Sequence, residues 1–393
     1  MRTRLLALAV LALAAGPLPA QSIKLSASLE QLQAQAQRDS LDPNAHYLLG
    51  LGYWSAKRYD DAERELRDAL AIDPRLATAE LAMAYLPFAR RPKLWDEIWD
   101  DRVPPEFRSQ LEESDRRYRH AFLVDPMVDI RIIAAVIPSS ADFVGMKNVF
   151  GEAVALFYQG FKDCQEGRYE DCHGRFTAMM RELDGERHPE RVPSSAFWYK
   201  GIAAAHVGKF EPAEAHFRML MSRNIADSLA TQDLTRVPLR TNEYRYTLGV
   251  IQQAAGKPMD AIMTFQEVLN NDVGAYMAHV RLANIYEAQK NYELAIRSRE
   301  FAVNVNPDDA SLVMDLGITL GKAGDMAGAE MRLRQALEQN PRDVRPLFWL
   351  GIATQAQGKK DASREAFTRF IQLAPSRYER QVASARERLT QLQ

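Results

Sequence analysis

The hydrophobic and small residues of the C-terminal half recur with a period of 34 residues. Pro307, Pro341 and Pro375 are each 34 positions apart and have similar surroundings. Four other series keep the same spacing: Leu248, Leu282, Leu316 and Leu350; Gly249, Ala283, Gly317 and Gly351; Ala261, Ala295, Ala329 and Ser363; Val268, Ala302, Ala336 and Phe370. This period is typical of a helix-turn-helix repeat. The pattern therefore predicts four contiguous repeats over residues 242–376, each made of two antiparallel helices.

Small residues in each repeat indicate how its two helices could approach each other. We expect glycines of the first helix to face small residues of the second: Gly50 with Ala62, Gly317 with Ala329, and Gly351 with Ser363. Gly324 is expected to end its helix in a left-handed conformation. The stretch GITLGKAG (317–324) therefore only resembles a phosphate-binding loop, and Ala323 stands where that loop needs a hydroxyl. Lys322 is expected to be exposed near a helix C-terminus.

Residues 43–76 show the complete pattern of one repeat. In register are Leu49, Gly50, Tyr53, Tyr59, Ala62, Leu66, Ala69 and Pro74. The pattern resembles the tetratricopeptide repeat, and the match runs over most of the chain. The resemblance implies an all-α fold of helix-turn-helix repeats stacked into a right-handed superhelical solenoid, whose first helices line the concave face. Members of that family mostly bind peptides or protein segments as scaffolds, and few are enzymes.

The N-terminal half departs from the ideal array by insertions. We expect two repeats over residues 43–126, the second split by an insertion near 90–108, and two degenerate repeats over 153–227. A partly buried linker (127–152) and a surface connector (228–241) are expected to separate them. Arrays need polar outer caps, and we assign these to helices within 21–42 and 377–393.

The first twenty residues have the tripartite pattern of a signal peptide. Arg2 and Arg4 precede an apolar run, Leu5 to Ala15, and Ala20 is a small residue at the expected cleavage point. We expect residues 1–20 to be removed and the chain to be exported to a periplasm or otherwise outside the cytoplasm. The alternative is an uncleaved N-terminal anchor.

The chain contains two cysteines, Cys164 and Cys172, in the stretch CQEGRYEDCH. Covalent haem attachment needs two residues between the cysteines, and seven stand here. A disulfide remains open, because it depends on whether the fold brings the two α-carbons together.

Charge and motif searches exclude several function classes. Fifty Lys and Arg against 52 Asp and Glu leave no positive excess of the kind that binds nucleic acid. No nucleophile elbow and no pair of histidines at metal-ligand spacing is present in the sequence. The seven histidines are scattered: His46, His120, His173, His188, His206, His216 and His279. We therefore expect no catalytic residue, no metal site and no cofactor.

The fifth and ninth positions of each repeat are expected on the concave side of the first helices. They form an apolar and aromatic stripe: Tyr47 and Leu51, Phe157 and Phe161, Trp198 and Ile202, Tyr246 and Val250, Val280 and Asn284, Met314 and Ile318, and Phe348 and Ile352. Such a groove would suit an amphipathic helix or an extended hydrophobic segment. The alternative is that the insertions fold into the groove and fill it, because long exposed apolar patches are rare. Arg281, Asn284 and Arg345 are too scattered to form the carboxylate clamp of chaperone-binding relatives.

Trp95 and Trp99 lie four residues apart in the first insertion and would share one face of a short helix. They could contact a partner, or they could form a local lid over a neighbouring helix.

The leading hypothesis is an exported, noncatalytic scaffold that binds a protein or peptide in this groove and contacts no nucleic acid, reaching a membrane only through a partner. The first alternative is a structural subunit of a cell-envelope or membrane-associated complex, which contacts partners through its insertions. The second is an enzyme or small-ligand receptor. Replacing Phe348 and Tyr246 by Asp should abolish binding in the groove.

Overall fold

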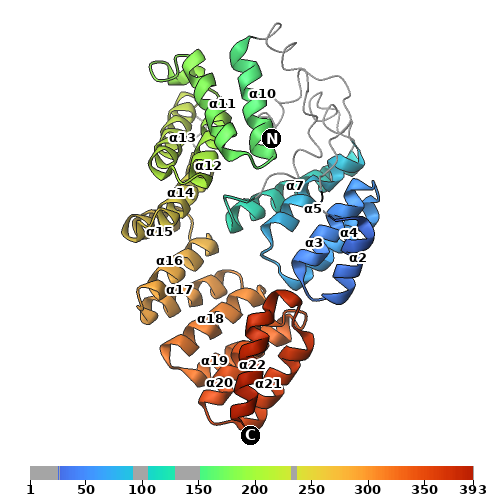
Figure 1. The fold of residues 1–393 in the computed structure, drawn as a ribbon. Helices are drawn as coiled ribbons and strands as arrows, with labels where there is room; N and C mark the ends of the chain where they lie inside the picture. The colour runs from blue at the N-terminus through green and yellow to red at the C-terminus, as the bar shows by residue number, and fades with distance from the viewer. Residues whose placement is uncertain (1–24, 26, 92–104, 129–150, 232–236, 393) are drawn as a thin grey trace. The chain divides into compact units, whose positions relative to one another are not determined.

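The computed structural model describes residues 25, 27–91, 105–128, 151–231 and 237–392 of the chain. All regular secondary structure in these ranges is helical (Figure 1). The longer helices are α2 (Leu29–Arg38), α3 (Pro43–Ser55), α4 (Tyr59–Ile72), α5 (Ala77–Arg90), α7 (Pro105–Val124), α10 (Glu152–Gln165), α11 (Tyr169–Glu182), α12 (Ser194–His206), α13 (Phe210–Thr231), α14 (Val237–Ala254), α15 (Pro258–Asn271), α16 (Tyr276–Ala288), α17 (Tyr292–Val305), α18 (Ala310–Ala323), α19 (Met326–Gln339), α20 (Arg345–Ala356), α21 (Lys360–Leu373) and α22 (Glu379–Gln391). Two short 3-10 helices, Pro189–Arg191 and Ser376–Tyr378, lie between them.

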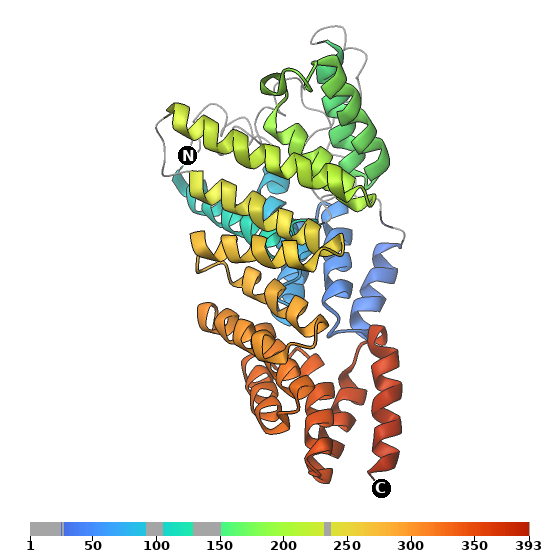
Figure 2. The same cartoon turned by 90° about the vertical axis from the view of Figure 1, so that its left-hand side faces the viewer.

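Consecutive helices pack as helix-turn-helix pairs. Residues 242–376 hold the pairs α14 with α15, α16 with α17, α18 with α19, and α20 with α21. The pair of α3 and α4 precedes them in sequence, as do the pairs of α10 with α11 and α12 with α13. Figures 1 and 2 show these pairs from two sides. The predicted all-α repeat fold is confirmed.

Helical glycines allow the two helices of a pair to approach closely. A Cβ added to Gly50 would lie 3.0 Å from Cγ of Leu66, and one added to Gly351 would lie 2.5 Å from the ring of Phe367. Gly317 meets Leu333 in the same way, at 3.0 Å. The side chains closest to these glycines therefore lie one helical turn beyond the expected Ala62, Ala329 and Ser363. The reason is that each glycine receives the large core residue of the second helix.

The helix ends follow the expected cap chemistry. Gly324 has φ 95° and ends α18, as predicted. At the other end of this helix, the side chain of Asp309 accepts a hydrogen bond from the backbone N–H of Ser311. Lys322 is exposed in the last turn, where its Nζ lies 2.6 Å from Glu287. These residues serve the helix rather than a nucleotide.

Some predicted segments differ from the structure or fall outside it. Helix α13 continues to Thr231 and α14 begins at Val237, so the described part of the expected connector (228–241) is helical. Helices α5 and α7 lie within the expected second repeat, and an ion pair of 2.9 Å between Arg117 and Glu80 joins them. The expected signal peptide, most of the expected linker 127–152, and Trp95 and Trp99 lie outside the described residues.

Cys164 and Cys172 form a disulfide bond, which settles the alternative that their spacing left open. It joins the C-terminal turn of α10 to α11, and the two α-carbons are 5.1 Å apart. Both sulfur-bearing side chains are buried.

The packing divides the chain into two compact units. One comprises Glu80–Asn271, and the other combines Leu25–Ala79 with Asp272–Gln393. The second unit therefore joins the first repeat to the last three repeats, although residues 80–271 separate them in sequence. None of the helices in the described part of the chain is long and apolar enough to cross a membrane.

Candidate functional site

The expected apolar stripe is largely covered by the chain itself. In the first unit, Trp198 lies edge-on against Phe122 of α7, with ring centroids 5.5 Å apart, and Phe157 packs on Phe176. In the second unit, Phe348 packs against Phe370, with centroids 5.3 Å apart. Leu51, Phe161, Ile202, Tyr246, Val250 and Met314 are buried, and Tyr47, Phe157, Trp198, Ile318, Phe348 and Ile352 are half-buried. The structure thus leaves none of these side chains fully exposed.

In the described part of the chain, the exposed large apolar side chains lie elsewhere, on or just after the second helices of the repeats. They are Met259, Met263, Val273, Leu294, Phe301, Val305, Met331 and Leu373. A shallow surface depression beside Phe301 is lined by residues of α17 alone, including Arg297 and Glu300. Helix α17 therefore presents apolar surface outward.

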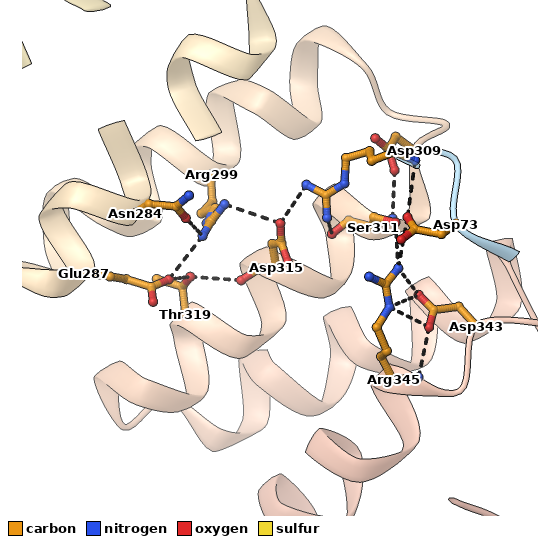
Figure 3. A network of polar contacts seen from close by, with 11 residues as sticks. Asp73, Asn284, Glu287, Arg299, Asp309, Ser311, Asp315, Thr319, Asp343 and Arg345 are labelled. Carbon is orange, nitrogen blue, oxygen red and sulfur yellow. Dashed lines mark hydrogen bonds and ion pairs between the residues drawn. The ribbon is translucent and has the colours of Figure 1, made fainter. Parts of the chain in front are cut away.

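A polar site lies where the turn after α4 meets α18 in the second unit. Arg75 Nη1 donates to Asp315 Oδ2 at 2.9 Å, and its Nη2 donates to the backbone oxygen of Ser311 at 3.4 Å. The Arg75 side chain is 14% exposed and that of Asp315 is 20% exposed. We call Ser311, Asp315 and Arg345 the Arg75 site (Figure 3).

Arg299 of α17 holds Asp315 from the opposite side. Its Nη1 lies 3.4 Å from Asp315 Oδ2, and its Nη2 donates to Asn284 Oδ1 at 2.6 Å. The Arg299 side chain is 7% exposed, and its Nε is buried without a hydrogen-bond partner. Glu287 extends the network by accepting from Thr319 and by pairing with Arg299 at 3.5 Å. Asp315 is therefore held in place between two guanidinium groups.

Arg345 forms the other half of the site. Its guanidinium donates to Asp343 at 2.8 Å and lies 3.3 Å from Ser311 Oγ. The same Nη2 lies 3.5 Å from Asp73, which comes two residues before Arg75. Asp73 accepts from the backbone N–H of Arg75 at 3.2 Å, so the Asp-Pro-Arg turn is ordered by its own side chain. The site thus contacts both a carboxylate and a guanidinium of one turn.

Further contacts flank this site along the first repeat. The Asn340 side chain donates to the backbone oxygens of Ala71 and Ile72, each at 3.1 Å. Three more side-chain pairs join the same two segments: Arg342 with Asp68 at 2.8 Å, Ser376 with Asp39 at 2.8 Å, and Arg377 with Asp42 at 2.9 Å. The first repeat contributes carboxylates, and the C-terminal repeats contribute mostly donors.

The charges shift one another's protonation. Burial raises the pKa of Asp315, but Arg75 and Arg299 outweigh it and hold that pKa below its usual value. Burial also opposes the charge on Arg75, yet the carboxylates of Asp315 and Asp309 raise its pKa. For Asp309 burial dominates and its pKa is raised. Asp315 is therefore the group best suited to carry the negative charge of the site.

The Arg75 site was missed by sequence reasoning. Arg345 and Asn284 were noted as scattered polar residues, and Arg75 and Asp315 drew no attention. Arg75 and Asp315 are separated by 240 positions, and a 34-residue period carries no information on that pairing. The available signal was weak: polar residues at positions of the first helices where the core does not require them.

Among the residues that the structure describes, one group of side chains has ligand atoms close enough for a metal ion, namely His46, Glu65 and Asp68. Its members already have partners. His46 bonds Glu65 at 2.8 Å through Nδ1 and the backbone oxygen of Ser40 at 3.0 Å through Nε2. Asp68 pairs with Arg342. The arrangement is that of an ion-pair network.

Comparisons with known proteins agree with the helix pairs. Models described as tetratricopeptide repeat match residues 43–76, 246–298 and 314–378. Over 137 residues the chain is 23% identical to human protein O-mannosyl-transferase TMTC1, a match that covers 34% of this chain and 16% of that protein's length.

Two similar solved structures have low sequence identity. The C-terminal part of a TPR repeat-containing protein from Cytophaga hutchinsonii has a TM-score of 0.48 and 16% identity, and the match covers 60% of this chain and 85% of that one. MamA from Desulfovibrio magneticus has a TM-score of 0.38 and 19% identity, with 46% and 94% covered. The segments matched by the family models coincide with helix pairs α3 with α4 and α14 to α21, and the chain is a tetratricopeptide-repeat protein.

Proposed function

We propose that the chain is an exported, noncatalytic scaffold that binds a segment of a partner protein. Tetratricopeptide repeats are protein-interaction scaffolds as a rule, and this supports the general class. The observation that carries the proposal is the Arg75 site, where first helices of the C-terminal repeats bind a peptide turn through side-chain and backbone contacts. These contacts are of the kind that recognises a polypeptide rather than transforms a substrate.

Export is supported by two independent features. The N-terminal sequence has signal-peptide character. The disulfide between Cys164 and Cys172 suits an oxidising compartment. Mass spectrometry of the protein from its native source tests this directly, since export with cleavage predicts a chain that begins at Gln21. A cytoplasmic chain that retains Met1 would contradict it.

The apolar stripe remains part of the proposal, but its test must respect the packing. Tyr246 is buried against Phe265 and Phe348 packs on Phe370, so Asp at either position would bury a carboxylate in the core. A loss of binding in those variants would not be distinguishable from unfolding. Asp315 of the polar site lies between Arg75 and Arg299, so a variant there is read for binding only after circular dichroism shows that its helical fold is retained.

The test is affinity purification of the tagged mature chain from its native envelope fraction. We compare wild type with Asp315→Lys, and with Asp361→Lys as a matched control at a side chain that is 98% exposed. A stoichiometric partner that is lost only with Asp315→Lys is the expected result. A partner retained by both variants would favour the structural-subunit alternative, with contacts through the insertions. Absence of any partner from all three samples would contradict the scaffold function.

A further inference from the structure

The contact between the turn at residues 73–75 and the C-terminal repeats has the features of an internal ligand in a recognition site. We propose that the Arg75 site binds a partner segment with a carboxylate and an arginine two residues apart, and that Asp73 and Arg75 of this chain occupy it as an intramolecular competitor. This inference rests on the proposed scaffold function and specifies the class of partner.

The site is matched to both charges of such a segment. The carboxylate of Asp315 and the backbone oxygen of Ser311 accept from the guanidinium of Arg75. Arg345 lies within 3.5 Å of the carboxylate of Asp73 (Figure 3). A segment with only one of the two charges would leave Asp315 or Arg345 without its present partner in this turn. The two contacts together therefore predict that the site recognises a segment with an acidic residue, then any residue, then an arginine.

The receiving side is organised independently of the turn it binds. Asp315 is held by Arg299, and Arg345 is held by Asp343, whose side chain is 5% exposed. Arg299 is in turn fixed by Asn284 and Glu287. Because these contacts lie wholly within the C-terminal repeats, they do not require the first repeat. Removal of Arg75 should leave a formed site in which Asp315 keeps Arg299 and loses its second guanidinium partner.

The contact between the turn at residues 73–75 and the C-terminal repeats is also of a type that an external segment can replace. Ion pairs and hydrogen bonds, several of them partly exposed, join residues 39–75 to residues 311–377, and Leu41 adds apolar packing against the cluster around Val344 and Leu347. Polar interfaces between parts of a chain resemble transient protein interfaces, and partly exposed ion pairs weaken as salt rises. An external segment with the same charges can therefore compete for the site.

The probe is a fluorescein-labelled peptide of residues 68–79, DALAIDPRLATA, and the same peptide with Ala in place of Arg75 serves as the control probe. Binding to the full mature chain is measured by fluorescence anisotropy at low and high salt. The proteins are wild type, Arg75→Ala, Arg75→Ala with Asp315→Asn, and Arg64→Ala. Arg64 is the matched control because it lies on α4, is exposed, and pairs with Asp61 of its own helix.

We expect Arg75→Ala to bind the probe at least about tenfold more tightly than wild type, because the tethered competitor has a high effective concentration. Arg64→Ala should bind like wild type. Adding Asp315→Asn to Arg75→Ala should abolish this increase in affinity. High salt should weaken binding of the probe, and the control probe should not bind. Equal affinity of Arg75→Ala and wild type, or equal binding of both probes, would overturn the inference.

If Arg75→Ala loses its helical circular dichroism signal, a second measurement tests the inference on the wild-type chain alone. Hydrogen exchange of the wild-type chain is then followed with and without saturating probe. Displacement predicts faster exchange of the backbone at residues 73–76 with the probe and not with the control probe, and unchanged exchange overturns the inference. These results can overturn the competitor proposal without overturning the scaffold function. A stoichiometric native partner in the affinity purification would still support the scaffold function.

Discussion

Replacing Gly351 by Ala tests how tightly the helix pairs of this array pack. Gly351 lies on α20, and the added Cβ would stand 2.5, 2.6 and 2.8 Å from three ring atoms of Phe367 on α21. Carbon atoms in contact prefer about 3.5–4.0 Å, so the ring must move by roughly 1 Å. Phe367 is fully buried and lies in a cluster with Leu347 and Phe370. The ring therefore has no free space to move into.

The magnitude combines two opposing effects. Overpacking of a close-packed core costs about 1–3 kcal/mol. Removing a glycine from a helix interior contributes about 1 kcal/mol in the stabilising direction. Gly351→Ala should therefore lower the free energy of unfolding by about 0–2 kcal/mol. This range is too wide for one variant to be informative, so a control is needed.

Gly321→Ala supplies that control within the same unit. Its added Cβ would lie 3.5 Å from the Cβ of Ala329, an ordinary contact, so only the helix-propensity gain should remain. The difference between the two variants should then approach the packing cost alone, about 1–3 kcal/mol in favour of Gly321→Ala. Thermal and urea unfolding, followed by circular dichroism, measure it. Equal stability of the two variants would refute the reasoning that Gly351 is required for close approach.

Two further predictions concern the first unit. Burial, together with the charges of Lys200 and His173, lowers the pKa of His216 from 6.5 to about 4. As the pH falls, His216 is therefore protonated in the unfolded chain before it is protonated in the folded one. Above pH 6.5 this residue should not change the free energy of unfolding, and between pH 6.5 and about 4 it should lower that free energy by at most about 3 kcal/mol. His216→Gln should flatten this part of the stability profile, whereas the same change at the more exposed His188 should not; identical slopes for wild type and His216→Gln would contradict the assignment. Replacing Cys164 and Cys172 together by Ser should cost about 2–3 kcal/mol, from the loop that their separation of 8 residues closes. Wild type treated with reductant should lose the same amount in thermal unfolding, and a melting temperature insensitive to reductant would show that the bond does not stabilise the unit.

Local features were predictable from the sequence because each depends on residues within one repeat. The helix pairs and the turn at Gly324 follow from a 34-residue period and from the backbone freedom of glycine. The disulfide could not be decided, since a spacing of seven residues permits it without fixing the distance between the α-carbons. The ion pair of Arg75 with Asp315 was out of reach for a different reason. It joins two repeats that are distant in sequence, and periodicity describes only the contacts of each repeat with its neighbours.

The repeat positions also explain which residues form the apolar stripe and which form the polar site. Phe348 and Tyr246 stand at the fifth position and pack on the second helix of their own pair. The residues of the Arg75 site stand instead at the second and sixth positions, namely Ser311 and Arg345 at the second and Asp315 at the sixth. Their polar groups contact one another and the turn at residues 73–75. At Phe348 and Tyr246 the stripe packs within its own helix pairs, and charge at the second and sixth positions is where specificity for a partner should be sought.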